Sequence, residues 1–173
     1  MTLGSHQTSI RKSQTHCTPR WIITRLGPFD LDPCAAHPRP WDCATANYIE
    51  TDDGLRRRWH GRVWLNPPYD RYEVARWIRK LADHGQGTAL LHARTEAEWF
   101  TPLWEAASSI LFMADRIKFC RADGTEQPHN SGAPPILATF GAADAERLRQ
   151  SGIPGSLVTQ WSWRPARSAD LFH

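Results

Sequence analysis

Four consecutive residues, Asn66, Pro67, Pro68 and Tyr69, combine the groups needed to hold a planar amine, and they follow the apolar run 63–65. The asparagine side-chain oxygen is one hydrogen-bond acceptor, and the Pro67 carbonyl is a second. Proline removes competing N–H donors and stiffens the loop, which fixes the direction of that carbonyl. The Tyr69 ring offers a flat face on which an extruded nucleobase can stack.

This combination suits methylation of an exocyclic amine on a nucleobase. The lone pair of such a nitrogen is delocalised into the ring, and acceptors on its two N–H bonds pull it toward tetrahedral geometry. Attack on a cationic sulfonium methyl group then needs positioning and hydrogen bonding more than a strong base. A purely structural interpretation also stands, in which a strand ends in Pro-Pro and the tyrosine covers the core.

The surrounding sequence predicts elements that place these residues at the end of a strand. Asp70 and Glu73 form a possible capping box for a helix whose apolar residues recur over 74–81, and Gly85 predicts its end. Thr95 and Glu98 predict a second capped helix, kinked or split at Pro102. The remaining predictions are a helix over 18–26 capped by Thr18, strands at 29–32, 62–65, 88–93, 109–113, 116–119, 135–140 and 156–163, a helix at 142–151, and a long loop at 33–51.

Alternation of strands and helices predicts an α/β fold with a largely parallel sheet. Ligands of such sheets bind beyond the carboxyl ends of the strands, where Asp32 and Asn66 both lie. Only 31 positions separate Asp32 from Val63, so two further strands and three helices do not fit between them. The sheet should therefore be abbreviated.

Composition restricts the class of protein. A length of 173 residues fits one domain, which we expect over 15–165 between tails at 1–14 and 166–173. The net charge of +3 rests almost wholly on arginine, which fits either nucleic-acid binding or genomic base composition. No signal peptide or long apolar run is evident, so we expect a cytoplasmic protein without membrane contact.

A metal site is not expected from the cysteines. Cys34, His37 and Cys43 are candidate ligands by residue type, but paired short spacings typical of zinc sites are missing. We therefore expect reduced cysteines and no metal.

Several segments together resemble one family, the small phage-type, Dam-like DNA N6-adenine methyltransferases, which use S-adenosylmethionine. They occur in that family's order and cover about 15–140: "TPRW" (18–21), "FDLDPCA" (29–35), "YIETDDGL" (48–55), "WHGRVWLNPPY" (59–69), "ARTEAEWF" (93–100) and "DRIKF" (115–119). The resemblance implies an abbreviated Rossmann-like methyltransferase sheet, mostly parallel with an antiparallel edge. It also implies a phage or prophage enzyme that methylates adenine site-specifically, as in restriction-modification.

The resemblance further implies roles for individual residues. Asn66, Pro67, Pro68 and Tyr69 match the catalytic tetrapeptide. The residues matching cofactor-binding positions are Thr18, Pro19, Asp32, Pro33, Cys34 and Asp53. Because Ala35 and Ala36 stand where larger methyltransferases have a glycine-rich turn, we expect the loop 33–55 to enclose the ribose and adenine. Turn and cap roles remain the alternative for Asp32 and Asp53.

DNA is the expected partner, with no obligate protein partner evident. Arg94, Thr95 and Lys118 are candidate DNA contacts, although Thr95 can instead cap a helix. The polar loop 120–134 is a candidate DNA-contacting insertion. Two other functions remain open: a methyltransferase of RNA bases or protein glutamine, and a non-catalytic nucleic-acid-binding module with the same fold.

Overall fold

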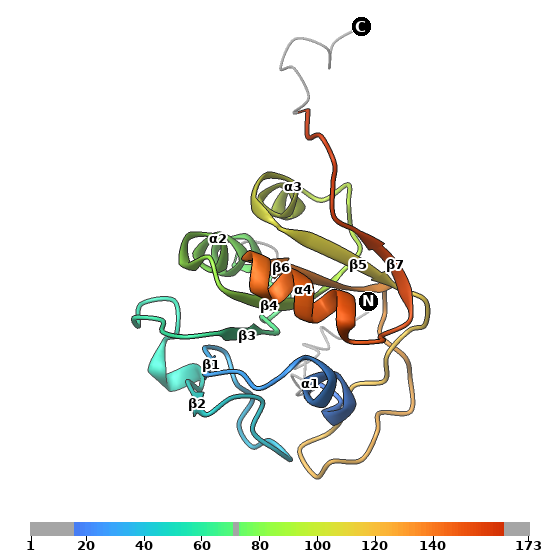
Figure 1. The fold of residues 1–173 in the computed structure, drawn as a ribbon. Coiled ribbons are helices and arrows are strands. Elements are labelled where there is room, and N and C mark those ends of the chain that lie inside the picture. Colours follow the sequence, from blue (N-terminus) through green and yellow to red (C-terminus); the bar gives the residue numbers. More distant parts are fainter. Residues whose placement is uncertain (1–15, 71–72, 165–173) are drawn as a thin grey trace, which may run out of the picture.

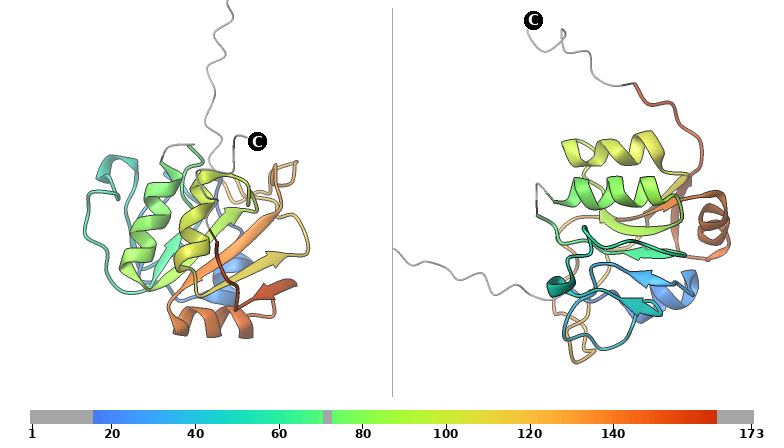
Figure 2. Two further views of the ribbon diagram at one scale, coloured as in Figure 1. Left: turned by 90° about the horizontal axis from the view of Figure 1, so that it is seen from above. Right: turned by 90° about the vertical axis from the view of Figure 1, so that its left-hand side faces the viewer.

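The protein forms one seven-stranded sheet with helices on both faces (Figures 1 and 2). The computed structural model describes residues 16–70 and 73–164, so the expected tails at 1–14 and 166–173 lie outside the described residues. The helices are α1 (Arg20–Leu26), α2 (Val74–His84), α3 (Thr101–Ala106) and α4 (Ala142–Gln150), with 3-10 turns η1 (Glu50–Asp52) and η2 (Glu98–Phe100). The strands are β1 (Leu31–Asp32), β2 (Ala46–Asn47), β3 (Val63–Leu65), β4 (Gly87–His92), β5 (Ser109–Met113), β6 (Pro135–Phe140) and β7 (Gly155–Val158).

The strand order is β2-β1-β3-β4-β6-β5-β7. The first four strands are mutually parallel, and β6 reverses direction against β4 through six residue pairs from Gly87↔Phe140 to His92↔Pro135. Strands β5 and β7 continue the antiparallel part. The expected mixed α/β fold is thus confirmed, with an antiparallel region of three strands. Between β1 and β3 the chain forms only β2 and η1, as an abbreviated sheet requires.

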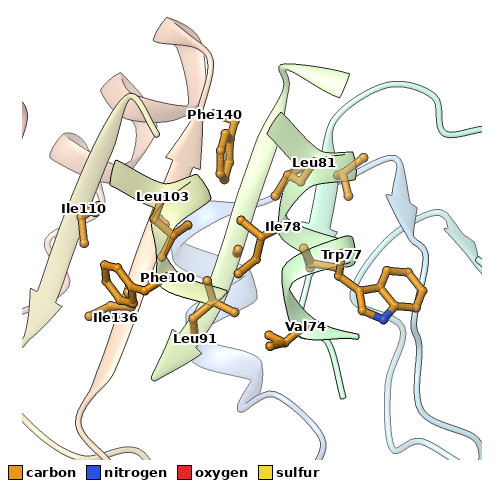
Figure 3. Close-up of a cluster of buried hydrophobic side chains, with 14 of the residues drawn as sticks. Val74, Trp77, Ile78, Leu81, Leu91, Phe100, Leu103, Ile110, Ile136 and Phe140 are labelled. Atoms are coloured by element: carbon orange, nitrogen blue, oxygen red, sulfur yellow. The ribbon is translucent and has the colours of Figure 1, made fainter. Parts of the chain in front are cut away.

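Alternation along the central strands builds a core on each side of the sheet. Val63 and Leu65 face α2 and α3, whereas Trp64 between them faces α1 and α4. Strand β4 is buried on both faces, as its continuous apolar run predicts. Figure 3 shows the first core, in which Ile78 of α2 and Leu103 of α3 lie over the sheet.

Helix α2 forms because its apolar residues fall on one stripe. Val74, Trp77, Ile78 and Leu81 are all buried, and each fully buried side chain of this kind contributes roughly 1.5–3 kcal/mol. The helix ends where Gly85 adopts φ 75°, a left-handed conformation that glycine takes without steric cost. At the start, the Asp70 carboxylate accepts a hydrogen bond from the Glu73 N–H (3.3 Å). The predicted helix and its end are confirmed.

Several local predictions are wrong. Residues 116–119 form no strand; only isolated bridges join Cys120 to Cys17 and Glu126. The loop 33–51 contains the two-residue strand β2, which is too short and too half-buried to give a periodic signal. Strand β7 ends at Val158, which pairs with Ile110, because its antiparallel partner β5 begins at Ser109 and extends no further. The Thr95 cap is also wrong, since η2 follows Ala97 without a side-chain cap. The helix is split into η2 and α3, as Pro102 predicted, and Pro102 lies in the first turn of α3, where its missing N–H costs nothing.

Candidate active site at the carboxyl edge of the sheet

The carboxyl ends of three parallel strands meet at one edge of the sheet. Asp32 ends β1, Asn66 follows β3, and His92 ends β4. The pairings Leu31↔Val63 and Leu65↔Ala89 place these ends side by side. Two residues 34 positions apart, Asp32 and Asn66, are therefore neighbours because of sheet register.

A small cavity of about 40 Å³ opens at this edge. It brings together four of the predicted site residues, Thr18, Asp32, Cys34 and Asn66, from three separate segments. The other lining residues are His16, Cys17, Ala36, Arg39, Trp41 and Cys43. A space of this size holds one or two water molecules, so a nucleoside-sized ligand must widen it or extend from its mouth.

Asp32 places a buried carboxyl group in the cavity wall. The side chain is 5% exposed, and its Oδ1 accepts a hydrogen bond from the Cys34 N–H (3.1 Å). Burial raises the pKa of Asp32 to about 7, and the Cys34 hydrogen bond opposes this rise only in part. A ligand that supplies an ammonium group or hydroxyl groups would stabilise the ionised form, which makes Asp32 suited to hold such a ligand.

Cys34 links the first strand end to the tetrapeptide. Its thiol donates a hydrogen bond to the main-chain oxygen of Asn66 (3.3 Å). Burial raises the pKa of Cys34 well above its usual value, so the group stays a protonated donor. The main-chain carbonyl of Asn66 is therefore already engaged.

The Asn66 side chain is held by the segment that precedes α1. Its Nδ2 donates to the His16 carbonyl (3.2 Å) and to Thr18 Oγ1 (3.4 Å). Thr18 was expected to cap α1; instead the cap position belongs to Pro19, without a side-chain hydrogen bond. The Thr18 hydroxyl therefore bonds Asn66 rather than the start of α1, which begins at Arg20 after the buried Pro19.

Tyr69 is anchored at its hydroxyl and open along its ring. The hydroxyl donates to the Leu90 carbonyl (3.3 Å), and its burial raises the pKa of Tyr69, so the phenol stays neutral. The ring stacks on His92, with centroids 4.1 Å apart and planes 9° apart, yet the residue remains 39% exposed. Within the tetrapeptide, Pro67 is buried and Pro68 is exposed. An aromatic platform thus stands beside Asn66.

Asp53 lies outside the cavity. It has φ 52° at the end of η1, and its exposed carboxylate pairs with Arg56 (3.2 Å). The adjacent Gly54 packs so closely on Pro33 that a Cβ would overlap the Pro33 carbonyl oxygen. The loop carrying Asp53 therefore borders the end of β1, while the side chain points to solvent.

The predicted DNA contacts are exposed and dispersed. Arg94 lies 4.0 Å from Glu96, and Thr95 is exposed beside it. Lys118 pairs with Glu126 (3.7 Å) on the wall of a second, wider groove of about 490 Å³. That groove also contains Trp21, Arg25, Met113, Asp115, Arg116, Ile117, Asn130 and Pro154. The segment 117–120 lies between the two hollows, since Phe119 contacts the ring of His16 at 5.2 Å.

A comparison with protein families decides the identity. The sequence model of DNA N-6-adenine-methyltransferase (Dam) matches residues 5–151. The chain belongs to the Dam family. This membership makes it a DNA adenine methyltransferase with DNA as its substrate, and Dam methyltransferases normally use S-adenosylmethionine. No curated protein and no solved structure gives a match.

Several residues of this Dam-family site were not singled out by their sequence. Trp41 donates from Nε1 to the Thr18 carbonyl (3.1 Å), and Arg39 lines the cavity beside it. Both lie in the proline-rich loop 33–51, where a large aromatic residue in a polar stretch was an available signal. His92 closes an apolar strand, and His16 acts through its main chain, for which the sequence carries no signal.

The described part of the Dam-family chain shows neither a membrane span nor a metal cluster. In residues 16–70 and 73–164, no helix has the length and apolar character needed to cross a bilayer. The same ranges contain no group of three His, Cys, Asp or Glu side chains arranged to bind a metal.

Proposed function

We propose that this Dam-family protein transfers a methyl group from S-adenosylmethionine to N6 of an adenine flipped out of DNA. The observation that carries the proposal is the orientation of Asn66 beside the buried Asp32. Because Nδ2 is directed at the His16 carbonyl, Oδ1 is the free acceptor, and no residue in the described ranges donates to it.

The tetrapeptide would activate the amine with two acceptors. Asn66 Oδ1 accepts from one N–H of the adenine amine, and the Pro67 carbonyl accepts from the other. The Asn66 carbonyl cannot substitute, since Cys34 donates to it. Hydrogen bonds to both amine protons free the nitrogen lone pair and direct it at the methyl group. One amine proton then leaves after the attack rather than before it.

Tyr69 would hold the plane of the flipped base. One face of its ring is covered by His92, and the hydroxyl bond to Leu90 fixes the tilt of the ring. Base–aromatic stacking is worth roughly 1–3 kcal/mol. A neutral phenol suits this role, because the platform needs a ring face and no proton transfer.

The buried carboxyl of Asp32 fits the cofactor. S-Adenosylmethionine, when bound, supplies an electrophilic methyl group on a sulfonium centre and brings an ammonium group and ribose hydroxyls. Asp32 would accept from such donors, and Pro33 and Cys34 would line the same strand end. Pro19 would border it from the α1 side, and Asp53 would close it after a movement of its exposed loop.

The groove beside the cavity would carry the DNA backbone. Arg25, Arg116 and Lys118 supply cations to it, and Trp21 is 42% exposed with Arg25 over its ring (5.7 Å). Arg94 and Thr95, beyond β4, would contact the strand on the other side of the flipped base. Because residues 16–70 and 73–164 form a single sheet with its helices, we propose that they read a short or lax target sequence, in a cytoplasmic enzyme of phage or prophage type.

Substitution of Asn66 tests the proposal. Asn66→Ala should reduce methyl transfer to adenine in duplex DNA by at least about a hundredfold, because a preorganised acceptor is lost. Calorimetric affinity for S-adenosylmethionine should change less than about threefold. Gln86→Ala, which removes an exposed amide at the opposite end of β4, is the matched control and should retain full activity.

Equal loss of transfer and cofactor affinity in Asn66→Ala would assign Asn66 a structural role and contradict the proposal. Parallel assays with single-stranded DNA, RNA and a glutamine-containing peptide identify the acceptor. Preference for RNA or peptide would replace the proposed substrate. Failure of the wild-type chain to bind S-adenosylmethionine would leave a DNA-binding module without this catalysis.

A further inference from the structure

The main-chain carbonyl of His16 distinguishes the nitrogen end of the Asn66 side-chain amide from its oxygen end. A carbonyl oxygen only accepts hydrogen bonds, so the group that faces His16 O at 3.2 Å must be the NH2 end. Thr18 Oγ1 accepts a second bond from the same nitrogen at 3.4 Å. The terminal torsion of asparagine has two broad, nearly equivalent settings, and the His16 carbonyl selects one of them. The Thr18 hydroxyl bonds the amide nitrogen in that setting and so holds the group in place.

The two acceptors are themselves held in place. Thr18 is 3% exposed, and its carbonyl accepts a hydrogen bond from Trp41 Nε1. The neighbouring Cys17 exchanges two main-chain hydrogen bonds with Cys120, at 3.0 and 2.8 Å. The short segment 16–18 is therefore clamped between the loop 33–51 and the segment 117–127.

We propose that Thr18 is a positioning residue for the methyl-transfer step, and that its hydroxyl, with the His16 carbonyl, locks the Asn66 amide with Oδ1 facing the target amine. The inference rests on the proposed function. It assigns Thr18 to the orientation of the amine acceptor rather than to the methionine end of the cofactor. Cys120 belongs to the segment that borders the second groove of the protein, where we propose that DNA binds. The main-chain hydrogen bonds between Cys17 and Cys120 therefore link that groove to the Asn66 amide.

A wrong setting of the amide would be severely unfavourable for catalysis. With the NH2 end turned outward, Asn66 would present a donor to an amine that needs an acceptor, and Oδ1 would face the His16 carbonyl oxygen. Removing the Thr18 hydroxyl leaves only the His16 carbonyl to hold the amide in the correct setting. The expected consequence is an Asn66 oxygen that is less firmly placed for the target amine, while cofactor affinity is retained.

Nuclear magnetic resonance tests the orientation without cofactor or DNA. The chain contains three asparagines, Asn47, Asn66 and Asn130, so selective ¹⁵N-asparagine labelling gives three side-chain NH2 pairs. The NH2 signals that are missing from the spectrum of Asn66→Asp are those of Asn66. In the wild type this pair should exchange with solvent at least about tenfold more slowly than that of the exposed Asn130. Thr18→Val should accelerate its exchange and leave the Asn47 pair unchanged.

Kinetics test the consequence. At saturating DNA and S-adenosylmethionine, Thr18→Val should lower the single-turnover rate constant about tenfold, the effect of one lost positioning hydrogen bond. The dissociation constant of the cofactor should stay within about twofold, and Thr18→Ser should restore most of the rate. Thr24→Val on the exposed face of α1 removes a hydroxyl that donates to the Arg20 carbonyl of the same helix, and it is the matched control.

Three results would overturn the inference. One is an Asn66 pair in the wild type that exchanges as fast as that of Asn130, which requires no variant to fold. Another is a Thr18→Val enzyme in which both the rate constant and the cofactor affinity are unchanged. The third is a Thr18→Val enzyme with a weakened cofactor affinity and an unchanged rate constant at saturation, which would assign Thr18 to the cofactor. Failure of the proposed function is separate, since the wild type would then methylate no adenine while the amide exchange remained protected.

Discussion

At the scale of single residues, Asp32 is a carboxyl group that the fold holds in surroundings unfavourable to its ionised form. A carboxylate buried at the end of β1 loses its hydration, and burial therefore raises its pKa to about 7 from an ordinary 3.8. Hydrogen bonds from Cys34 and the positive charge of Arg39 compensate only in part for this burial. A folded-state pKa above that of the unfolded chain means that stability is full below about pH 4 and is lost as the pH rises through about 7.

Asp32→Asn should therefore stabilise the fold at high pH. The free energy of unfolding at pH 8 should rise by a few kcal/mol, about 4 at most, because no buried charge forms. At pH 4.5 the variant and the wild type should be similar. Urea unfolding over this pH range checks the prediction, and a constant difference at every pH would contradict it.

The same substitution should weaken the binding of S-adenosylmethionine. In the wild type, affinity should increase between pH 6 and pH 8, because the ionised carboxylate accepts from cofactor donors and the protonated form does not. In Asp32→Asn the affinity should be lower at pH 8 and nearly independent of pH. Calorimetry across this range measures both, and an identical pH profile in the two proteins would exclude Asp32 as the titrating group.

At the scale of elements, α4 is fastened to the sheet by a buried ion pair. Arg62 at the start of β3 donates from Nε to Asp144 of α4 (2.7 Å), and Thr88 of β4 donates to the same carboxylate oxygen (3.0 Å). Arg62 also donates to the Leu26 carbonyl (2.6 Å) and lies over the Phe29 ring at 4.0 Å. This cluster fixes α1, α4 and two strands at the edge opposite the candidate site.

Asp144→Ala should lower the free energy of unfolding by about 3–5 kcal/mol, because it leaves Arg62 buried without its charge partner. Cofactor affinity at low temperature should be nearly unchanged, since the pair lies far from the cavity. Glu146→Ala, on the exposed face of the same helix, removes a surface pair with Arg149 and should have little effect. Equal losses of unfolding free energy in the two variants would contradict a larger contribution from the buried pair.

At the scale of the whole molecule, the parallel and antiparallel halves of the sheet carry different features. The parallel half carries the candidate site, and the antiparallel half ends in β7, which lies beyond the family match at 5–151. After β7 the chain crosses α3, where Trp161 Nε1 donates to the Trp104 carbonyl (2.9 Å) and Trp163 stacks on Trp104. This final segment covers an apolar surface of α3 that the family region by itself would leave open.

Trp161→Ala should destabilise the protein by about 2 kcal/mol, through lost packing and a lost hydrogen bond, while leaving the methylation rate constant unchanged below the unfolding transition. Trp163→Ala should cost less, because Trp163 is 39% exposed. Denaturant unfolding with a parallel activity assay checks both. A loss of activity without a loss of stability would instead place the aromatic cluster in substrate binding.

The sequence by itself determined the features that depend on near neighbours. The stripe Val74, Trp77, Ile78 and Leu81 specifies α2, and Gly85 ends it, because helical periodicity and a left-handed glycine are local properties. The apolar run before Asn66 likewise specifies β3 and places the tetrapeptide at its carboxyl end. Local reasoning failed at β2 and at 116–119, where pairing partners rather than periodicity decide.

Only the tertiary structure decided what surrounds the tetrapeptide. Asn66 is oriented by His16 and Thr18, nearly fifty residues earlier, and Tyr69 stacks on His92 of the next strand. Asp53 stays in solvent although its loop reaches Pro33. These contacts follow from strand order and register, which bring distant segments to one edge, and no residue's nearest neighbours in the sequence encode them.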